Sequence, residues 1–372
     1  NYQTPELLLE MVDLMLFYAS QGAQVIRLDA IAYLWKEIGT GCIHLPQTHA
    51  FIQLLRAVFD AAAPYVQIIT ETNVAHTENI SYFGDGTNEA QLVYNFALPP
   101  LVLHTLLCGD CSALSGWAAG LELPSDKTTF FNFLASHDGI GLNPARGILS
   151  EQAIDALVQS CLAHGGAISY KNNPDGSQVP YEMNINYFDA LSDPAAGESG
   201  TMQIDRFMAA YAIALALKGV PGIYFHSLVG SRNWNQGLAL TGEKRSINRE
   251  KLIWETLVHT LADSQSLRAR VLDRFRQLLR IRSASAAFDP YGEQRVLDAG
   301  PGVFAVLRTG ARGNDQYLCL QNVTDSEKTA FGKVLQPYQT CWLDTGNSNS
   351  GDQFCSPQKK SSVDQTHTTT EE

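Results

Sequence analysis

Acidic residues stand at the ends of three predicted strands. Asp29 comes directly after the apolar run Gln24–Leu28, which is typical of a buried parallel strand. Glu71 and Asp138 each end a later apolar run in the same way. Burying a carboxylate costs several kcal/mol unless it is paired. We therefore expect each of these acids to have a partner and a chemical task.

The chemistry that such acids can do is cleavage of a glycosidic bond. One carboxylate attacks or stabilises the anomeric carbon, and the other protonates the leaving oxygen. Asp29 and Glu71 end consecutive strands, so their side chains can converge at one edge of a sheet. Arg27 is two residues before Asp29, which places both on one face of the strand. There the guanidinium would keep Asp29 ionised as a nucleophile, whereas Glu71 would need a raised pKa to serve as the acid.

Each of these residues also has an ordinary structural explanation. Arg27 and Asp29 can form a structural ion pair, Glu71 can cap the loop that follows it, and the adjacent His137 and Asp138 can be a satisfied buried pair. The combination is more specific than its parts, because acids at the ends of separate strands, in this order, are a pattern that β/α barrels use for catalysis.

Predicted helices and strands alternate along the first part of the chain. Helices are predicted from Pro5 to Gly22, with Thr4 as a cap, and at 51–63, and strands at 24–28, 66–72, 92–96, 130–134 and 222–225. This alternation predicts an α/β fold with a parallel sheet. A barrel closes at eight strands, and an open doubly wound sheet is the alternative. No glycine-rich phosphate loop follows any strand, which weakens the alternative.

The remaining chain differs in texture. The stretch at about 139–200 is rich in Gly, Pro, Asn and Asp and is predicted to be an inserted, loop-rich region. Helices follow at 204–217 and 257–285, the second broken near Ser264. Short alternating runs at 303–307 and 317–320 predict a small antiparallel sheet. We divide the chain into a catalytic part (1–286), a C-terminal β domain (287–344) and a disordered polar tail (345–372).

Composition excludes several classes of function. The net charge is −12 and no stripe rich in lysine and arginine is present, which argues against nucleic-acid binding. No apolar run reaches the roughly 18 to 20 residues of a membrane span. The seven cysteines are odd in number and scattered, which favours free thiols in a reducing compartment, so a cytoplasmic location is predicted. The single C-x-x-C pair, Cys108 and Cys111, lacks the second pair that a zinc site needs.

Three short motifs resemble those of the α-amylase superfamily (glycoside hydrolase family 13). The run Ile26–Ala30 resembles its nucleophile motif, Thr70–Glu71 its acid/base motif, and His137–Asp138 its transition-state-stabilising motif. The resemblance implies that Asp29 is the nucleophile and Glu71 the general acid/base. It also implies that Asp138 holds the sugar hydroxyls with help from His137, and that Arg27 orients Asp29.

Longer segments resemble one subfamily, that of sucrose phosphorylase. These segments are 96–104, 137–141 and 184–191, whereas 143–149 and 246–252 resemble its glucosylglycerate phosphorylase branch. The resemblance covers roughly Thr4 to Asp344 and implies the C-terminal part, strands 4 to 8, of a (β/α)8 TIM barrel of α-amylase type, followed by a small antiparallel β domain. The family's first motif, an Asp and a His near its third strand, has no counterpart here. We therefore expect an N-terminally truncated chain that is poorly active alone.

The implied reaction is a double displacement with retention. A glucosyl unit leaves an α-glucoside, becomes bonded to Asp29 and passes to phosphate, giving α-glucose 1-phosphate without a metal or an organic cofactor. The partners are thus a small sugar substrate and phosphate. Phosphate needs cations at the acceptor side, where arginine binds it through two N–H groups. Arg232, in the loop 227–234, is the candidate, with His226 and Arg249 as others, although each can equally be an ordinary surface or structural residue.

Two other functions remain open at this stage. A hydrolase or transglycosylase of the same superfamily would use the same three acids, and the residues around Asp138 argue against it. A noncatalytic amylase-like protein need not keep Asp29, Glu71 and Asp138, all of which are present. The glucosyl acceptor (glycerate, fructose, a sugar phosphate or glycerol) and the oligomeric state also stay open.

Overall fold

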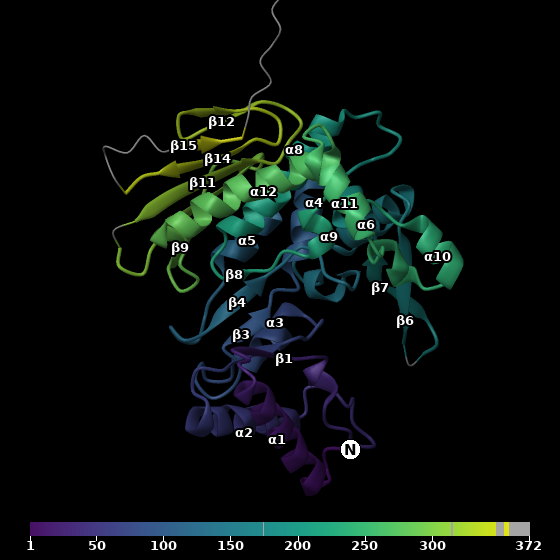
Figure 1. Cartoon of the computed structure of the whole chain (residues 1–372), viewed down its shortest axis with the longest axis vertical. Coiled ribbons are helices and arrows are strands. Elements are labelled where there is room, and N and C mark those ends of the chain that lie inside the picture. The colour runs from purple at the N-terminus through teal and green to yellow at the C-terminus, as the bar shows by residue number, and fades with distance from the viewer. Residues whose placement is uncertain (174, 314, 347–352, 357–372) are drawn as a thin grey trace, which may run out of the picture.

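The computed structural model describes residues 1–173, 175–313, 315–346 and 353–356. A five-stranded sheet of order β1-β2-β3-β4-β8 runs through its lower half (Figure 1). Every neighbouring pair in this sheet is parallel. The strands are β1 (Val25–Leu28), β2 (Gln67–Thr70), β3 (Leu92–Tyr94), β4 (Thr129–Asn132) and β8 (Val220–Pro221). The predicted α/β class is therefore confirmed.

Helices connect these strands and cover the sheet. Pro5 starts the first helix, where its fixed φ and missing N–H suit the first turn, although the Thr4 side chain makes no capping hydrogen bond. The helices are α1 (Pro5–Ser20), α2 (Pro46–Ala62), α3 (His76–Asn79), α4 (Leu98–Cys108), α5 (Ser112–Ala119), α8 (Gly200–Ala216), α9 (Phe225–Leu228), α10 (Asn235–Thr241), α11 (Trp254–Ala262) and α12 (Leu267–Ala284). The predicted break near Ser264 is present, between α11 and α12.

A sharp turn follows β1, the strand that carries the first candidate acid. Ala30, directly after Asp29, has a φ of +46°, and the chain then enters the 3-10 turn η1 (Ile31–Tyr33). Left-handed backbone is uncommon for a residue with a Cβ. The turn places Asp29 at the carboxyl end of β1, with Tyr33 following beside it.

The fifth strand is displaced from its predicted position. Residues 222–225 were predicted as the strand, but β8 ends at Pro221 and α9 begins at Phe225. The reason is packing: a Cβ on Gly222 would lie 2.2 Å from Cζ of Phe131, so only glycine fits against this ring. The prediction of strand at 222–225 is thus wrong by two or more residues.

The region predicted to be loop-rich contains regular structure. It holds β5 (Ile140–Gly141), η3 (Asn143–Ala145), α6 (Glu151–Ala163), β6 (Ala167–Asn172), β7 (Gln178–Asn184) and α7 (Tyr187–Ala190). The strands form an antiparallel sheet of order β5-β7-β6. The turn residues around Gly176 lie between β6 and β7. The prediction of a loop-rich region was wrong because it took the composition of this one turn as typical of the whole region.

An antiparallel sheet of order β15-β14-β11-β10-β9 forms the C-terminal part, as predicted for the C-terminal β domain (Figure 1, upper left). Its strands are β9 (Glu293–Leu297), β10 (Val303–Thr309), β11 (Gln316–Asn322), β14 (Thr340–Asp344) and β15 (Gln353–Cys355), and a small hairpin pairs β12 (Lys328–Ala330) with β13 (Lys333–Leu335). The turn η5 (Ala286–Phe288) precedes it, and Phe288 of η5 shares one hydrophobic core with residues of α8, α12 and one face of the sheet, among them Phe304 and Trp342.

Two predictions for the C-terminus need correction. Most of the predicted disordered tail, 347–352 and 357–372, lies outside the described residues. Within it, β15 pairs with β14, and Cys355 forms a disulfide with Cys341. Disorder is therefore wrong for Gln353–Cys355, and free thiols are wrong for these two cysteines. The other five, Cys42, Cys108, Cys111, Cys161 and Cys319, are free.

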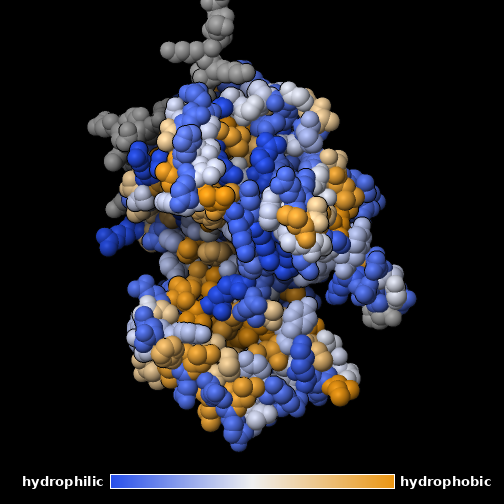
Figure 2. Space-filling model, turned by 45° about the vertical axis from the view of Figure 1, so that its right-hand side comes forward, coloured by the Kyte–Doolittle hydropathy of each residue, from blue (hydrophilic) through white to orange (hydrophobic). Residues whose placement is uncertain are grey.

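Hydrophobic surface gathers on the lower half of the molecule (Figure 2). Leu9 and Phe17 of α1 are 62% and 55% exposed, and Val25 of the edge strand β1 is 51% exposed. Across the part of the chain that the structure describes, no helix combines the length and the apolar character that a bilayer crossing requires.

Candidate active site

A cavity of about 380 Å³ opens at the carboxyl ends of the parallel strands. Asp29 enters it from the end of β1, Glu71 from β2, and His137 and Asp138 from the loop after β4. The structure thus brings together the three acids that the sequence places at separate strand ends. The other lining residues are Ala30, Ala32, Tyr33, Thr72, Asn73, Phe96, Gly139, Tyr181, Glu182, Arg245 and Arg249.

Arg27 joins the first two acids. Its Nη1 donates to Oδ1 of Asp29 at 2.7 Å, and its Nη2 lies 3.9 Å from Oε2 of Glu71. The guanidinium of Arg27 lies over the ring of Tyr94, 5.5 Å from the ring centroid, and this cation–π contact helps to hold the guanidinium in place. The Asp29 carboxylate therefore has a cationic partner that holds its orientation, as a nucleophile needs.

Glu71 has a different environment from Asp29. Its side chain is 13% exposed, compared with 71% for Asp29. Burial raises the pKa of Glu71, and the hydrogen bond from Ala30 and the charge of Arg27 offset part of this rise. The nearby Asp29 and Asp138 raise the pKa further. A buried carboxyl group with a raised pKa, beside an exposed carboxylate paired with an arginine, has the properties of a general acid beside a nucleophile.

Two arginines hold Asp138. Its Oδ1 lies 2.6 Å from Nη1 of Arg245 and 3.1 Å from Nη2 of Arg249. The side chain of Asn248 donates to the carbonyls of Ser136 and Asp138, both at 3.0 Å. His137 Nε2 lies 3.5 Å from the other carboxylate oxygen, Oδ2. Asp138 is therefore fixed through Oδ1, and His137 is the ion-pair partner found for Oδ2 among the described residues.

The ring of Phe96 lines the cavity beside the acids, and other aromatic rings pack behind it. The Phe96 ring centroid lies 5.6 Å from that of Tyr94 and 5.2 Å from that of Phe133. Tyr94 in turn packs against Phe131. An apolar ring at the wall of a polar cavity offers a surface for the face of a sugar, while the charged groups reach its hydroxyls.

Arg232, predicted to bind phosphate, does not line this cavity. Its Nε pairs with Oδ1 of Asp189, and its guanidinium lies 5.0 Å from the ring centroid of Phe188. The backbone N–H of Asn233 bonds to the same carboxylate. Asp189 is buried, which raises the pKa of its carboxyl group. These contacts give Arg232 a structural task, as the partner of a buried acid.

His226 also lies away from the cavity. It is buried in α9, and its Nδ1 is 2.9 Å from the hydroxyl of Ser231. Burial, followed by the charge of Arg268, lowers the pKa of His226. Arg249 is the one member of the predicted phosphate-binding group that lines the cavity.

Several cavity residues were missed from the sequence. Tyr181 and Glu182 lie on β7, in the region predicted to be irregular, so nothing in the sequence pointed them toward the acids. Arg245 lies in the 3-10 turn η4 (Lys244–Asn248), four residues before Arg249, and that spacing was the available signal. Asn73 Oδ1 is buried with no hydrogen-bond partner among the described residues and is a free acceptor at this wall. No group of three or more His, Cys, Asp or Glu in the described ranges has a geometry that could hold a metal ion.

Known proteins resemble the chain in both sequence and structure. A glucosylglycerate phosphorylase from Spirochaeta thermophila is 52% identical over 88% of the chain and 55% of that protein. A sucrose phosphorylase from Agrobacterium vitis is 32% identical over 76% of the chain and 54% of that protein. The crystal structure of sucrose 6F-phosphate phosphorylase from Thermoanaerobacter thermosaccharolyticum superposes with a TM-score of 0.72, at 22% identity, over 93% of the chain and 62% of that structure.

The chain spans 55% of the length of the Spirochaeta relative and 62% of the solved structure. No protein-family model matches it. The chain is more than 50% identical to one phosphorylase and more than 30% identical to a second kind. The cavity with three acids at the strand ends is consistent with this similarity. Over the part of these proteins that it spans, the chain is thus similar in sequence to glucosylglycerate phosphorylases and sucrose phosphorylases, and it shares the fold of the solved sucrose 6F-phosphate phosphorylase.

Proposed function

We propose that the protein containing this chain is a retaining glycoside phosphorylase that transfers a glucosyl unit from an α-glucoside to phosphate. The observation that carries the proposal is the unequal pair of acids, the exposed Asp29 beside Arg27 and the buried Glu71 with its raised pKa. Relatives named glucosylglycerate phosphorylase make α-glucosylglycerate the preferred glucoside for testing.

The reaction has two steps. In the first, a carboxylate oxygen of Asp29 bonds to the anomeric carbon, the bond from that carbon to the leaving oxygen breaks, and the proton of Glu71 passes to that oxygen. In the second, a phosphate oxygen bonds to the anomeric carbon, the ester to Asp29 breaks, and Glu71 takes back a proton from phosphate. Two inversions give α-glucose 1-phosphate. Asp138 and His137 would hold the sugar hydroxyls during both steps.

Cations at the cavity favour phosphate over water as the second nucleophile. Arg245 and Arg249 line the cavity, and their side chains are 43% and 40% exposed. Half-exposed guanidinium groups at a cavity wall can still donate N–H groups to an anion. Since Arg232 and His226 lie elsewhere, we assign the binding of phosphate mainly to Arg249, with the positive charge of Arg245 beside it.

We further propose that the parallel sheet is strands 4 to 8 of a (β/α)8 barrel, completed by polypeptide that this chain does not contain. In support, β1 and β8 are edge strands in the described sheet, and the relatives are longer than the chain.

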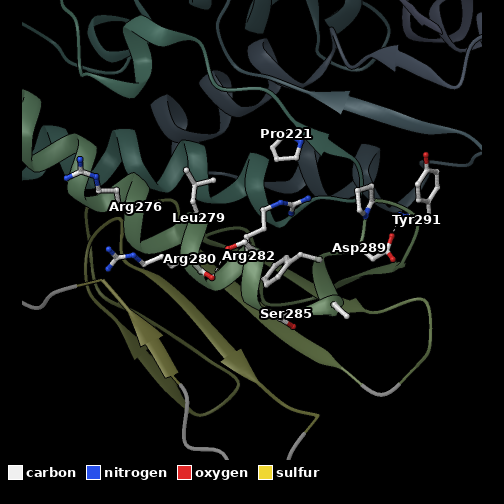
Figure 3. A pocket seen from close by; sticks show the side chains of 12 residues that line it. Pro221, Arg276, Leu279, Arg280, Arg282, Ser285, Asp289 and Tyr291 are labelled. Carbon is white, nitrogen blue, oxygen red and sulfur yellow. Dashed lines mark hydrogen bonds between the residues drawn. The ribbon is translucent and has the colours of Figure 1, made fainter. Parts of the chain in front are cut away.

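A second cavity, of about 900 Å³, lies beside Pro221 of β8 and the end of α12 (Figure 3). It is lined by Arg282, Phe288 and other residues but by only one acid, Asp289, so it is suited to packing rather than to sugar chemistry.

The division into residues 1–286 and 287–344 is kept as part of this proposal. The first part would hold the barrel and the active site, and the second the antiparallel sheet. A cytoplasmic location stays a prediction.

The test is a comparison of α-glucosylglycerate cleavage by the full-length protein with and without phosphate. A phosphorylase forms α-glucose 1-phosphate and is accelerated by phosphate. A hydrolase or transglycosylase of the same superfamily releases glucose, or moves it to another sugar, at a rate that phosphate does not change.

A further inference from the structure

The Arg245 guanidinium contacts two carboxylates at once. Its Nε and Nη2 donate to the two carboxylate oxygens of Glu182 at 2.9 and 2.7 Å, and its Nη1 lies 2.6 Å from Oδ1 of Asp138. All three nitrogens of the group are therefore used. The rigid fork of arginine permits this geometry, and lysine, with one nitrogen, has no equivalent.

Glu182 is held firmly at its own end. The residue is 1% exposed and lies on β7, between β5 and β6. A buried carboxylate is costly unless it is paired, and Arg245 supplies the one ion pair found for Glu182 among the described residues. The buried Glu182 is therefore the fixed partner, and it orients the more exposed Arg245.

The backbone after Asp138 belongs to the same sheet. Ile140 pairs with Met183 and Gly141 with Glu182, so β5 starts two residues beyond Asp138. The approach is close, because a Cβ on Gly139 would lie 2.6 Å from Cγ of Glu182 and 2.5 Å from the carbonyl oxygen of Met183. Asp138 is thus fixed relative to Glu182 through the backbone as well as through Arg245.

We propose that Glu182 and Arg245 act as a positioning pair that holds the Asp138 carboxylate in its reactive orientation. The proposal rests on the proposed glucosyl transfer. Since Arg245 and Arg249 both contact Oδ1, they leave Oδ2 to face the sugar beside His137. Arg245 is then committed to two carboxylates, and phosphate binding falls mainly to Arg249, whose carboxylate contact is with Asp138 alone among the described residues.

The test uses the full-length protein and α-glucosyl fluoride, whose leaving group needs no proton from Glu71. At saturating phosphate, which removes the glucosyl unit from Asp29, the rate of fluoride release then reports turnover through the glucosyl–Asp29 bond without proton donation by Glu71 to the leaving group. The variants are Glu182→Gln, Arg245→Gln, Arg245→Lys and the double variant Glu182→Gln/Arg245→Gln. Arg276→Gln is the matched control, because Arg276 is an exposed arginine of α12 that pairs with Asp273.

A positioning pair predicts a specific pattern. Each single variant lowers kcat for fluoride release by about 10- to 100-fold, since small displacements of reacting groups cost this much. The KM for phosphate stays within about twofold, Arg245→Lys does not rescue, and the double variant is no worse than either single one, because the residues act as a unit. The double variant also leaves no unpaired buried charge, so it reports on the pair even if a single variant fails to fold.

Two results would overturn the inference. One is wild-type kcat in Glu182→Gln. The other is a raised KM for phosphate with an unchanged kcat in Arg245→Gln, which would make Arg245 a phosphate ligand. If the unmodified protein releases fluoride but is not accelerated by phosphate, the proposed phosphorylase function fails while the positioning pair can still be judged.

Discussion

The backbone N–H of Ala30 donates a hydrogen bond of 2.9 Å to Oε2 of Glu71. Ala30 follows Asp29, so the turn that ends β1 also positions the acid that ends β2. The backbone N–H of Glu71 in turn bonds to the carbonyl of Leu28 at 3.1 Å. The main chain after β1 and the side chain of Arg27, which contacts both acids, therefore hold the two carboxyl groups relative to each other.

Substitution of the nucleophile gives the first prediction. Asp29→Asn in the full-length protein removes the group that forms the covalent bond, and we expect kcat for phosphorolysis to fall by about 10⁴-fold or more. Fold and stability should be kept, because the Asp29 side chain is 71% exposed. Asp13→Asn, at an exposed position of α1, is the control. Unchanged turnover in Asp29→Asn would show that another group attacks the sugar.

Substitution of the acid gives the second prediction. Glu71→Gln should lower kcat/KM for α-glucosylglycerate by about 10² to 10⁴-fold, as expected for a lost general acid. The loss should be much smaller for α-glucosyl fluoride, whose leaving group needs no proton. Equal losses with both substrates would mean that Glu71 acts by binding the sugar and not by proton transfer.

The pH dependence of activity gives the third prediction. Glu71 must be protonated in the first step, and its pKa is raised by burial. We expect kcat/KM to fall with increasing pH above that raised pKa, and the fall to disappear in Glu71→Gln. An alkaline limb that survives in the variant would belong to a different group.

Stability provides a fourth prediction that can be tested on this chain without any activity. A raised folded-state pKa means that folding favours protonated Glu71, so its contribution to stability is complete below the ordinary glutamate pKa of 4.5 and is lost as pH rises through the folded pKa. Between about pH 5 and about pH 8, the free energy of unfolding of the unmodified chain should therefore fall relative to that of Glu71→Gln. Urea unfolding at both pH values measures this, with Glu10→Gln, an exposed position of α1, as control. A difference that does not change with pH would contradict the raised pKa.

Substitution of Arg232 gives the fifth prediction, which distinguishes a structural role of this residue from a role in phosphate binding. Arg232→Gln leaves the buried Asp189 with only its backbone partner at this point, and we expect a loss of about 1 to 3 kcal/mol in the free energy of unfolding. The double variant Asp189→Asn/Arg232→Gln should recover part of that loss, since no buried charge is left unpaired. The KM for phosphate should not change. A large rise in that KM with unchanged stability would return Arg232 to the phosphate site.

The site residues that could be predicted from the sequence are those whose position follows from the local pattern of apolar and polar residues. Asp29 and Glu71 follow short apolar strands, and such strands place their ends at one edge of a parallel sheet. Glu182 and Arg245 could not be found in this way, because their position depends on the pairing of β5 with β7 and on the course of η4 across the cavity. Arg232 was misassigned for a related reason: its partner, Asp189, lies 43 residues earlier in the chain, in the region that was predicted to be loop-rich.

The strands of the fold also divide into those that the local sequence pattern predicts and those that depend on tertiary contacts. Strands β1 to β4 were predicted within a few residues, because each is a compact apolar run bounded by turn residues. The strand β8 was displaced because its end is set by the contact of Gly222 with Phe131, a tertiary constraint with no local signal. The β6–β7 hairpin was missed because its turn composition outweighed the weak alternation of its strands.

The central claim is that phosphate, and not water, receives the glucosyl unit from Asp29. The most direct measurement is the product of α-glucosylglycerate cleavage by the full-length protein with phosphate added, followed by NMR of the anomeric proton. The account predicts α-glucose 1-phosphate as the main product, at a rate that rises with phosphate concentration until the site is saturated. Free glucose as the main product, at a rate independent of phosphate, would contradict it.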